Sequence, residues 1–508
     1  MMGPIRVRFA PSPTGALHIG GVRTALYNYL LAKKYQGTFI LRIEDTDQVR
    51  YVPGAEAYIM EALRWCGLMP DEGPGLGGEF GPYCQSERKA IYARYAQELL
   101  DKGQAYYAFD TPEALEQQRE QDKTFKYDAA TRLRLRNSLA LPEAETVRLL
   151  AEGHPHTIRL KVTPGQTIVI QDLVRGDVRF QSDELDDKVM LKADGLPTYH
   201  LANIVDDHLM QITHVIRGEE WLPSTAHHVL LYRAFGWESE MPQFAHLPLI
   251  LKPDGKGKLS KRDGVRLGIP VFPIAWEDEN PEDSFTGFRE FGVLPEALLN
   301  FLAFLGWNPG TEQEIFSLDE LTAAFSIEKI GKAGARFDLD KAKWFNQQYI
   351  QATDVVTLAR MVRPMIEAQG HQPADAWLEG FCALMRDRVT LLPDFWEKGY
   401  YFFEPVREYD VKNVQKRWKP ELRAGFEQLH ARLSDVAGSQ WQGPVVQEVV
   451  NSLMQAQNFK PGEVLPLLRI ALAGTMQGPA VFEMMALLGQ TVCLQRLETA
   501  IASFDKME

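Results

Sequence analysis

The chain of 508 residues is long enough for about three or more domains of roughly 150 residues each, and its 45% hydrophobic content is ordinary for a globular protein. A formal net charge of −13 argues against nonspecific coating of nucleic acid, although an acidic body can still carry a local basic track. The amino terminus lacks the charged-then-apolar build of a signal peptide, and no stretch reaches the ~20 apolar residues of a membrane span. We therefore expect a cytoplasmic protein with no membrane partner.

The chain opens with a predicted strand, turn and helix. Residues 5–9 alternate apolar side chains with arginines, as a β-strand with two unlike faces does. Two prolines and a glycine then end the strand, and apolar positions between residues 22 and 35 share one helical face. His18, Gly20 and Gly21 thus lie at the helix amino terminus, where free N–H groups and partial positive charge favour an anion. The alternative is an ordinary glycine-rich helix start with a solvated histidine.

A second predicted strand follows at residues 38–43 and ends in an acidic cluster. Strand, helix and strand in this order form a βαβ unit of a parallel sheet, in which ligands bind beyond the carboxyl ends of the strands. We therefore expect His18 and Glu44 at the same edge of one sheet. Asp45 and Asp47 fit a ligand site and a solvated loop equally well.

Between residues 105 and 181, charged helical stretches give way to strand-like pieces, which predicts an α/β insertion within the first fold. Strands are predicted at residues 157–162, 167–170 and 178–180. Four cations in this region could bind phosphate groups, or else form the solvent-exposed face of a half-buried sheet: Arg159, Lys161, Arg175 and Arg179. A second candidate basic track comprises Arg119, Lys123, Lys126, Arg132, Arg134 and Arg136.

The parallel sheet is predicted to resume with a strand at residues 212–216, so that Arg217 leaves its carboxyl end toward the ligand edge. Residues 255–264 hold three glycines and four cations, a composition typical of a mobile surface turn or of a general anion binder. Residues 270–285 are rich in proline and acidic side chains, and we expect a loop or insertion there, with no function assigned.

Helices are predicted for most of the remaining chain. Residues 291–302 form one, with Pro295 near its first turn, and helical periodicity dominates from about residue 352 to the end. Residues 412–419 combine positive charge with Trp418, which would stack on a nucleic-acid base or lie on a solvated helix face. The four cysteines at 66, 84, 382 and 493 are spaced for neither a zinc knuckle nor a disulfide framework.

Two motifs carry a resemblance to a known family. Residues 8–15 with 18–21 resemble the first signature of class I aminoacyl-tRNA synthetases, in the glutamyl form whose fourth position is glycine, here Gly21. Residues 258–262 resemble the second signature, with the leucine and arginine that are usual in the glutamyl form. The similarity covers nearly the whole chain, tightly to about Asn346 and loosely after it.

This resemblance implies a Rossmann-like, parallel-sheet α/β catalytic domain with an inserted α/β domain, followed by a mostly α-helical region. The implied parts are the catalytic domain at 1–104 and 201–255, an acceptor-end-binding insertion at 105–200, a mobile lysine loop with a tRNA stem-contact domain at 256–346, and a helical anticodon-binding region at 347–508. The implied reaction joins L-glutamate to the 3′-terminal adenosine of tRNA(Glu) through a glutamyl-adenylate, using ATP with Mg²⁺. A monomer is implied.

The resemblance also assigns site residues. The implied catalytic residues are His18, Lys258 and Lys261, with Lys261 expected to matter most. The implied ATP site comprises Ser12, His18, Gly20, Gly21, Glu220, Lys258, Ser260 and Lys261. The implied glutamate site comprises Arg8, Ala10, Ser12, Glu44, Tyr199, Asn203 and Arg217, in which the arginines hold carboxylates and Glu44 holds the amino group. No protein metal site is expected, and no zinc, because the region that carries zinc ligands in some relatives reads Tyr107-Ala108-Phe109-Asp110.

Several alternatives stay open at this point. For Arg8 and Arg217, the less favoured alternative is a structural ion pair at the sheet edge. A glutaminyl enzyme would end in β-structured domains, and a glutamyl-queuosine enzyme would stop soon after the catalytic core. A catalytically inactive relative that only binds RNA, and a small-molecule nucleotidyltransferase, are two further possibilities. The sequence leaves open whether tRNA(Gln) is also charged, and which residues would read an anticodon.

Overall fold

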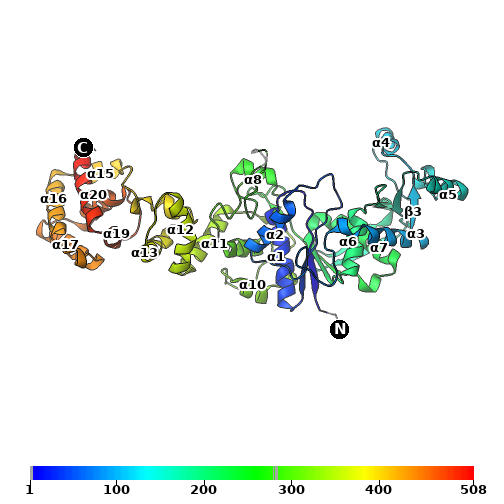
Figure 1. The fold of residues 1–508 in the computed structure, drawn as a ribbon, viewed down its shortest axis with the longest axis horizontal. Helices are drawn as coiled ribbons and strands as arrows, with labels where there is room; N and C mark the ends of the chain where they lie inside the picture. Colours follow the sequence, from blue (N-terminus) through cyan, green and yellow to red (C-terminus); the bar gives the residue numbers. More distant parts are fainter. Residues whose placement is uncertain (1–3, 279, 281–283, 508) are drawn as a thin grey trace. The chain divides into compact units, whose positions relative to one another are not determined.

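The computed structural model describes residues 4–278, 280 and 284–507. The chain forms two compact units, each drawn in Figure 1. The first comprises residues 1–290 with 298–339, and the second comprises residues 291–297 with 340–508. The first unit mixes helices and strands around a largely parallel sheet and the second is helical, which confirms the predicted fold class.

A six-stranded sheet organises the first unit. In spatial order its strands are β2 (Thr38–Leu41), β1 (Arg6–Phe9), β8 (His214–Gly218), β9 (Gln243–Leu247), β5 (Thr167–Asp172) and β6 (Gly176–Gln181). Every neighbouring pair is parallel except the β5–β6 hairpin. The carboxyl ends of the parallel strands therefore meet along one edge, as the βαβ pattern predicts.

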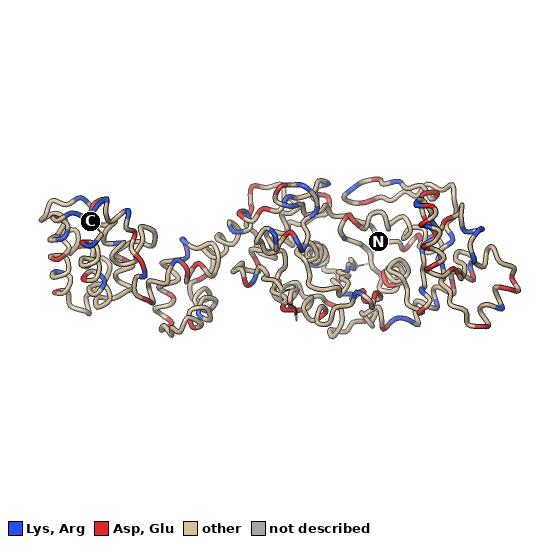
Figure 2. Tube along the Cα trace, turned by 90° about the horizontal axis from the view of Figure 1, so that it is seen from above, with Lys and Arg blue, Asp and Glu red and all other residues tan. Residues whose placement is uncertain are grey.

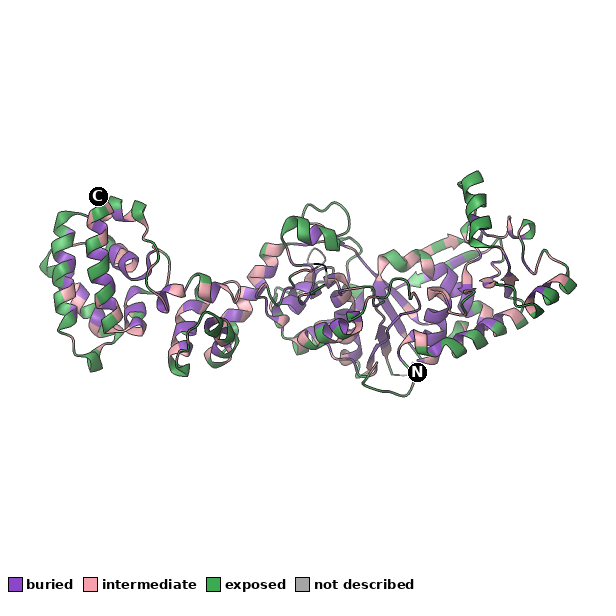
Figure 3. Ribbon diagram, turned by 45° about the horizontal axis from the view of Figure 1, so that its top comes forward, coloured by how far each residue is buried: buried purple, intermediate pink, exposed green. Residues whose placement is uncertain are grey.

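Helices cover the faces of this sheet at β1, β2, β8 and β9, whose residues are mostly buried. α1 (Ile19–Lys34) connects β1 to β2 and buries the apolar face that the sequence predicts. Figure 3 shows the central strands as buried, with exposed surface on the outer helices. The other helices before the insertion and after it are α2 (Ala55–Trp65), α3 (Lys89–Asp101), α6 (Tyr199–Leu209) and α7 (Leu222–Phe235).

A separate antiparallel sheet forms the inserted part. Its strands are β3 (Ala105–Ala108), β4 (Thr157–Leu160) and β7 (Val189–Leu191), with helices α4 (Pro112–Gln121) and α5 (Glu143–Ala151). The β5–β6 hairpin, which we expected inside the insertion, extends the large sheet instead. Ile168 and Ile170 of β5 are buried in that core while their neighbours are exposed. Alternation predicts a strand but not its partner, so the sequence could not indicate this placement.

Three cations from the two candidate basic groups, Arg132 of the 119–136 track and Arg159 and Arg175 of the phosphate candidates, have structural partners. Arg132 is buried and pairs with Asp187 at 3.0 Å. Arg159 lies over the Tyr127 ring, with its guanidinium carbon 3.9 Å from the ring centroid. Arg175 forms an ion pair with Glu219. Figure 2 shows positively and negatively charged residues interleaved along the trace.

The rest of the first unit follows the large sheet. It contains β10 (Ile250–Leu251), β11 (Ala335–Arg336), α8 (Lys261–Leu267) and α10 (Leu318–Ala324). α9 (Pro295–Phe304) begins at the proline predicted near its first turn, and residues 295–297 of this helix belong to the second unit. β10 and β11 pair in parallel. Within the expected loop at 270–285, Trp276 and Phe285 form an isolated bridge, and residues 279 and 281–283 lie outside the described residues.

The second unit consists of helices over its described residues. They are α11 (Leu339–Ala352), α12 (Val355–Ala368), α13 (Asp375–Met385), α14 (Asp394–Glu397), α15 (Val411–Arg417), α16 (Pro420–Ser434), α17 (Gly443–Ala456), α18 (Pro461–Ala473), α19 (Val481–Leu488) and α20 (Gln490–Phe504). The described part of the chain contains no helix with the length and apolar content that crossing a membrane requires.

Trp418 lies in the core of this unit, so both suggestions for it, stacking on a base and a place on a solvated helix face, are wrong. The side chain is buried, and its indole N–H donates to Asp505 at 3.0 Å. Its ring contacts Phe426 and Phe504 edge-on. An aromatic beside charged residues is compatible with either environment, and here the apolar helix faces that meet at this position bury it.

Candidate active site

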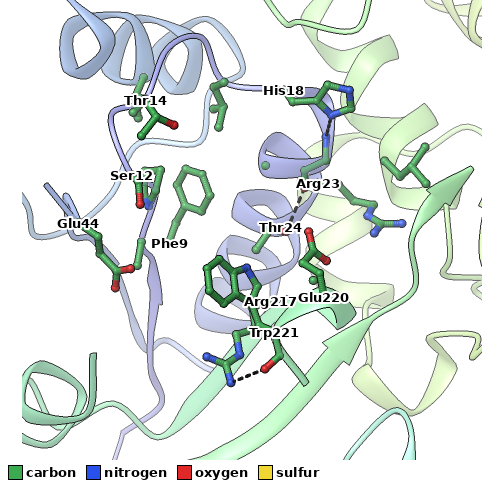
Figure 4. A pocket seen from close by; sticks show the side chains of 18 of the residues that line it. Phe9, Ser12, Thr14, His18, Arg23, Thr24, Glu44, Arg217, Glu220 and Trp221 are labelled. Atoms are coloured by element: carbon green, nitrogen blue, oxygen red, sulfur yellow. Dashed lines mark hydrogen bonds between the residues drawn. The ribbon is translucent and has the colours of Figure 1, made fainter. Parts of the chain in front are cut away.

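A cavity of 580 Å³ opens at the carboxyl edge of the large sheet, and all the candidate residues lie around it. The first loop and α1, the ends of β2 and β8, and the start of α6 contribute to its wall (Figure 4). The lining includes Arg8, Ala10, Ser12, His18, Gly20, Gly21, Glu44, Tyr199, Asn203, Arg217, Glu220, Lys258, Ser260 and Lys261. The fold thus brings together residues that are up to about 250 positions apart in the chain, as parallel strand order predicts.

His18 caps α1 and is thereby held in one tautomer. Its Nδ1 accepts the backbone N–H of Gly20 at 3.1 Å, so the ring proton must be on Nε2. Among the described residues, the buried Nε2 has no hydrogen-bond partner. Burial, followed by the charges of Lys258 and Lys261, lowers the pKa of His18 to about 3. A neutral imidazole with a free N–H donor therefore faces the cavity, which suits a phosphate oxygen.

Two lysines add positive charge at the rim of the cavity. Lys258 pairs with Glu220, with 2.6 Å between Nζ and Oε1. Lys261 is exposed, and partial loss of water around its ammonium lowers its pKa. The expected loop ends here, because Lys261 begins the short helix α8, which Ser260 and Asp263 cap. The Ser260 hydroxyl donates to Asp263 at 2.5 Å, so this candidate for ATP binding also has a local structural partner.

A buried ion network lies beneath the glutamate-site candidates. Asp207 accepts from Arg8 Nε at 3.0 Å and from Arg42 at 2.7 Å, and Arg42 also pairs with Glu44 at 3.1 Å. Burial alone would raise the pKa of Asp207, but the two arginines lower it below its ordinary value. For Arg8, the structural ion pair that we considered is present, although the residue also lines the cavity.

Arg217 differs from Arg8 because all of its contacts are neutral. Its Nε donates to His246 Nε2 at 3.1 Å, and its terminal nitrogens donate to the Tyr199 hydroxyl at 2.6 Å and the Thr225 hydroxyl at 2.8 Å. A further long contact of 3.4 Å reaches the Trp221 carbonyl (Figure 4). The residue is buried, and among the described residues it has no ion pair. A buried cation without an anionic neighbour is costly unless a ligand supplies the anion.

Glu44 offers a carboxylate at the same end of the cavity. Its Oε1 accepts from Asn203 at 3.2 Å as well as from Arg42, and burial raises the pKa of Glu44. The neighbouring acids have local structural contacts instead: Asp45 accepts the backbone N–H of Ser86, and Asp47 pairs with Arg50. Asp47 therefore fits the prediction of a solvated loop, whereas Asp45 holds the backbone at Ser86 by a hydrogen bond.

Sequence reasoning missed several residues that shape the site. Arg42 and Asp207 hold the ion network, and Trp221 packs on Tyr199 with ring centroids 4.6 Å apart. Arg23 is buried in α1 and donates to the carbonyls of Leu305 and Pro248. The sequence signal for Arg42 and Arg23 is a charged residue within an otherwise apolar strand or helix face. Such a residue indicates that a hydrogen-bonding or charged partner is buried beside it, but does not identify that partner.

The described residues contain no group of three or more His, Cys, Asp or Glu side chains that could hold a metal ion. The cavity therefore offers donors for anions and the Glu44 carboxylate for a cation, but no metal cage among those residues. This donor set suits a substrate that combines phosphates, carboxylates and an ammonium group.

Comparisons with known proteins agree with this chemistry. Residues 4–344 match the family model for the catalytic domain of class I (E and Q) tRNA synthetases, and residues 357–501 match an anticodon binding domain. The chain is 53% identical to the glutamate–tRNA ligase of Porphyromonas gingivalis, over 98% of each chain. It is 50% identical to that of Amoebophilus asiaticus, over 99% of this chain and 98% of the relative.

A solved structure is similar over the same length. The crystal structure of a glutamate tRNA ligase from Elizabethkingia meningosepticum in complex with its amino acid superposes with a TM-score of 0.95. The two chains are 47% identical, and the match covers 99% of this chain and 100% of the other. A second structure, of glutamate-tRNA synthetase from Elizabethkingia anophelis, gives a TM-score of 0.92 at 47% identity, covering 98% of this chain and 100% of the other.

Proposed function

The chain belongs to the class I tRNA synthetases of the E and Q group, and we propose from its site that it is a glutamate–tRNA ligase. The enzyme activates L-glutamate with ATP to form glutamyl-adenylate, and then transfers the glutamyl group to the 3′-terminal adenosine of tRNA(Glu). AMP and pyrophosphate are released. The observation that carries the glutamate assignment is Arg217, a buried guanidinium whose protein contacts among the described residues are neutral.

In the first step, an oxygen of the α-carboxylate attacks the α-phosphorus of ATP, and the bond to the bridging oxygen of the β-phosphate breaks. The protein needs to position the two substrates and stabilise negative charge on the phosphate oxygens. We assign His18 to donate its Nε2 proton as a hydrogen bond to a phosphate oxygen, supported by its fixed tautomer. Lys258 and Lys261 would stabilise the departing pyrophosphate.

Glutamate recognition divides among the buried groups. Arg217 would pair with the side-chain carboxylate, and Arg8, already paired with Asp207, would direct its remaining donors toward a substrate carboxylate. Glu44 would hold the ammonium group, beside Asn203 and Tyr199. Glutamine is rejected in this scheme because its neutral amide cannot compensate the buried charge of Arg217.

The ATP end of the cavity comprises the residues near the start of α1 and the lysine loop. The proposed contacts there are Ser12, Gly20, Gly21, Glu220 and Ser260, in addition to the three catalytic residues. ATP would enter as its Mg²⁺ complex, with the ion supplying positive charge at the phosphates, and we propose no zinc site. In the second step, a ribose hydroxyl of the terminal adenosine attacks the adenylate carbonyl and AMP leaves.

We further propose that the insertion at 105–200 binds the acceptor end of the tRNA, residues 256–346 contact its stem, and residues 347–508 bind its anticodon. The match of residues 357–501 to an anticodon binding domain supports the last assignment. A cytoplasmic monomer is proposed as the working form, since the reaction needs only one cavity and substrates present at protein synthesis.

Glutamate-dependent exchange of pyrophosphate into ATP, with and without tRNA(Glu), tests this function. Exchange that appears only with tRNA supports a ligase whose activation step depends on tRNA. Exchange without tRNA keeps the chemistry but points to an enzyme of the glutamyl-queuosine type. Folded protein that binds RNA yet exchanges with no amino acid would overturn the proposal.

A further inference from the structure

A chain of three side chains leads from the β5–β6 hairpin to the cavity. Asp172 at the end of β5 contacts His246 of β9, with 2.6 Å between Oδ2 and Nδ1. His246 in turn contacts Arg217 of β8, with 3.1 Å between Nε2 and Nε. All three residues are buried. Arg217 and His246 are directly opposite in the parallel register of β8 and β9, so their side chains lie on the same face of the sheet.

Asp172 is itself firmly held. Its Oδ1 accepts the backbone N–H groups of Val174 and Arg175 at 2.9 and 2.8 Å, and the carboxylate also accepts the N–H of His246 at 3.2 Å. With this many donors around it, Asp172 is an acceptor only, so the proton between the two side chains belongs to His246 Nδ1. The Nε2 atom of His246 must then present its lone pair to Arg217.

This tautomer matches the guanidinium. Arginine nitrogens only donate, so Arg217 Nε needs an acceptor, and His246 Nε2 supplies one that carries no negative charge. A carboxylate in that place would orient Arg217 equally well but would neutralise it. The imidazole keeps the negative charge of Asp172 one side chain away, which leaves the charge of Arg217 available to a ligand.

We propose that Asp172 and His246 are positioning residues for substrate recognition: the carboxylate fixes the imidazole tautomer, and the imidazole orients Arg217 toward the amino-acid side chain. The proposal rests on the proposed function, because it deepens the glutamate assignment of Arg217. It also gives the β5–β6 hairpin a role, since the hairpin brings Asp172 to the edge of the large sheet.

The test compares two substitutions of one residue in the full-length protein with tRNA present. His246→Asn keeps an N–H donor near Asp172 but is too short to reach Arg217, whereas His246→Gln can place its carbonyl oxygen where Nε2 lies. We expect His246→Asn to raise the KM for glutamate about 10- to 100-fold, the usual cost of losing a hydrogen bond to a charged group, with the KM for ATP within about twofold of wild type. His246→Gln should recover much of that loss.

Asp172→Asn provides an independent variant. The amide oxygen can keep the contacts with Val174 and Arg175, while its NH₂ group faces His246 Nδ1 and forces the other tautomer. Two N–H groups then oppose each other at Arg217, and the KM for glutamate should rise as in His246→Asn.

Each outcome separates this inference from the function itself. Wild-type protein without glutamate-dependent exchange would refute the ligase function and this inference together. Normal wild-type exchange, with an unchanged KM for glutamate in a folded variant, would overturn the positioning role alone. Equal losses in His246→Asn and His246→Gln, or a parallel rise in the KM for ATP, would show a general packing role and also overturn it. If His246→Asn does not fold, Asp172→Asn decides between these results.

Discussion

Replacing Arg217 by glutamine should weaken glutamate binding without weakening the fold. The side chain is buried and its contacts among the described residues are neutral, so the folded protein bears the cost of an uncompensated charge until a substrate carboxylate arrives. A charge pair at about 4 Å and an effective dielectric constant of about 20 is worth roughly 4 kcal/mol. Arg217→Gln should therefore lower kcat/KM for glutamate by roughly a thousandfold.

Arg42→Gln is the matched control, because Arg42 is equally buried but pairs with Asp207 and Glu44. Removing it leaves the buried Glu44 without its cation and Asp207 with Arg8 alone, and breaking a buried pair in this way typically costs about 3–5 kcal/mol. We expect Arg42→Gln to lower the Tm clearly, whereas Arg217→Gln leaves the Tm unchanged or raises it.

The assay is pyrophosphate exchange with glutamate and ATP varied in turn, beside thermal unfolding of the same preparations. We expect Arg217→Gln to lower kcat/KM for glutamate without lowering the Tm, and Arg42→Gln to lower the Tm. If Arg217→Gln destabilises the protein as much as Arg42→Gln, the guanidinium is a structural element. If Arg217→Gln keeps wild-type kcat/KM for glutamate, it does not hold the substrate.

Three further predictions follow from particular residues. Lys261→Ala should lower kcat of exchange about 100-fold or more, because the departing pyrophosphate loses a stabilising charge. The control Lys256→Ala, on the same exposed loop, should keep kcat within about twofold of wild type. Equal effects of the two substitutions would contradict a specific role for Lys261. Burial lowers the pKa of His18 from 6.5 to about 3, so between pH 6.5 and pH 3 the imidazole is protonated in the unfolded chain but not in the folded protein. The free energy of unfolding should therefore fall as the pH drops from 6.5 toward 3, by at most about 1.4 kcal/mol per pH unit from this group. His18→Asn, which can still cap α1, should flatten that dependence of Tm on pH, and an unchanged slope would argue against it. Trp418→Ala should destabilise the helical unit by about 3–5 kcal/mol, which calorimetry can measure. Lys416→Ala, at an exposed position, should leave the Tm of that unit unchanged. If Trp418→Ala instead kept the Tm and lost much of its tRNA affinity, burial of the indole would be contradicted.

The sequence predicts the elements that position the site because their signals are local. Alternation from residue 5 to 9, a glycine-rich helix start and a second apolar strand are enough to place His18 and Glu44 at one sheet edge. The same logic places Arg217 there, at the end of a later strand. These predictions need only the hydrophobic periodicity of each segment and the rule that the carboxyl ends of parallel strands lie along the same edge of the sheet.

Partners that are distant in the chain could not be predicted in the same way. Arg42 lies within an apolar strand, and its partner Asp207 is 165 residues later. The strand signal of β5 contains no information on whether it joins the small sheet or the large one. Trp418 has charged neighbours, and only the packing of Phe426 and Phe504 around it decides that it is buried.

The ion network constrains the order in which a growing chain can acquire its structure. β1 and β2 leave the ribosome early, but Arg8 and Arg42 meet their shared counter-charge only when Asp207 follows, 199 and 165 residues later. At ~5–20 residues per second, this interval amounts to roughly 10–40 s of synthesis. During that time Arg8 has no carboxylate partner and Arg42 has only Glu44, so burying both cations before α6 is made would be costly. The ion network is thus completed only after the entire insertion has been made, while β8 and β9 of the same sheet follow still later.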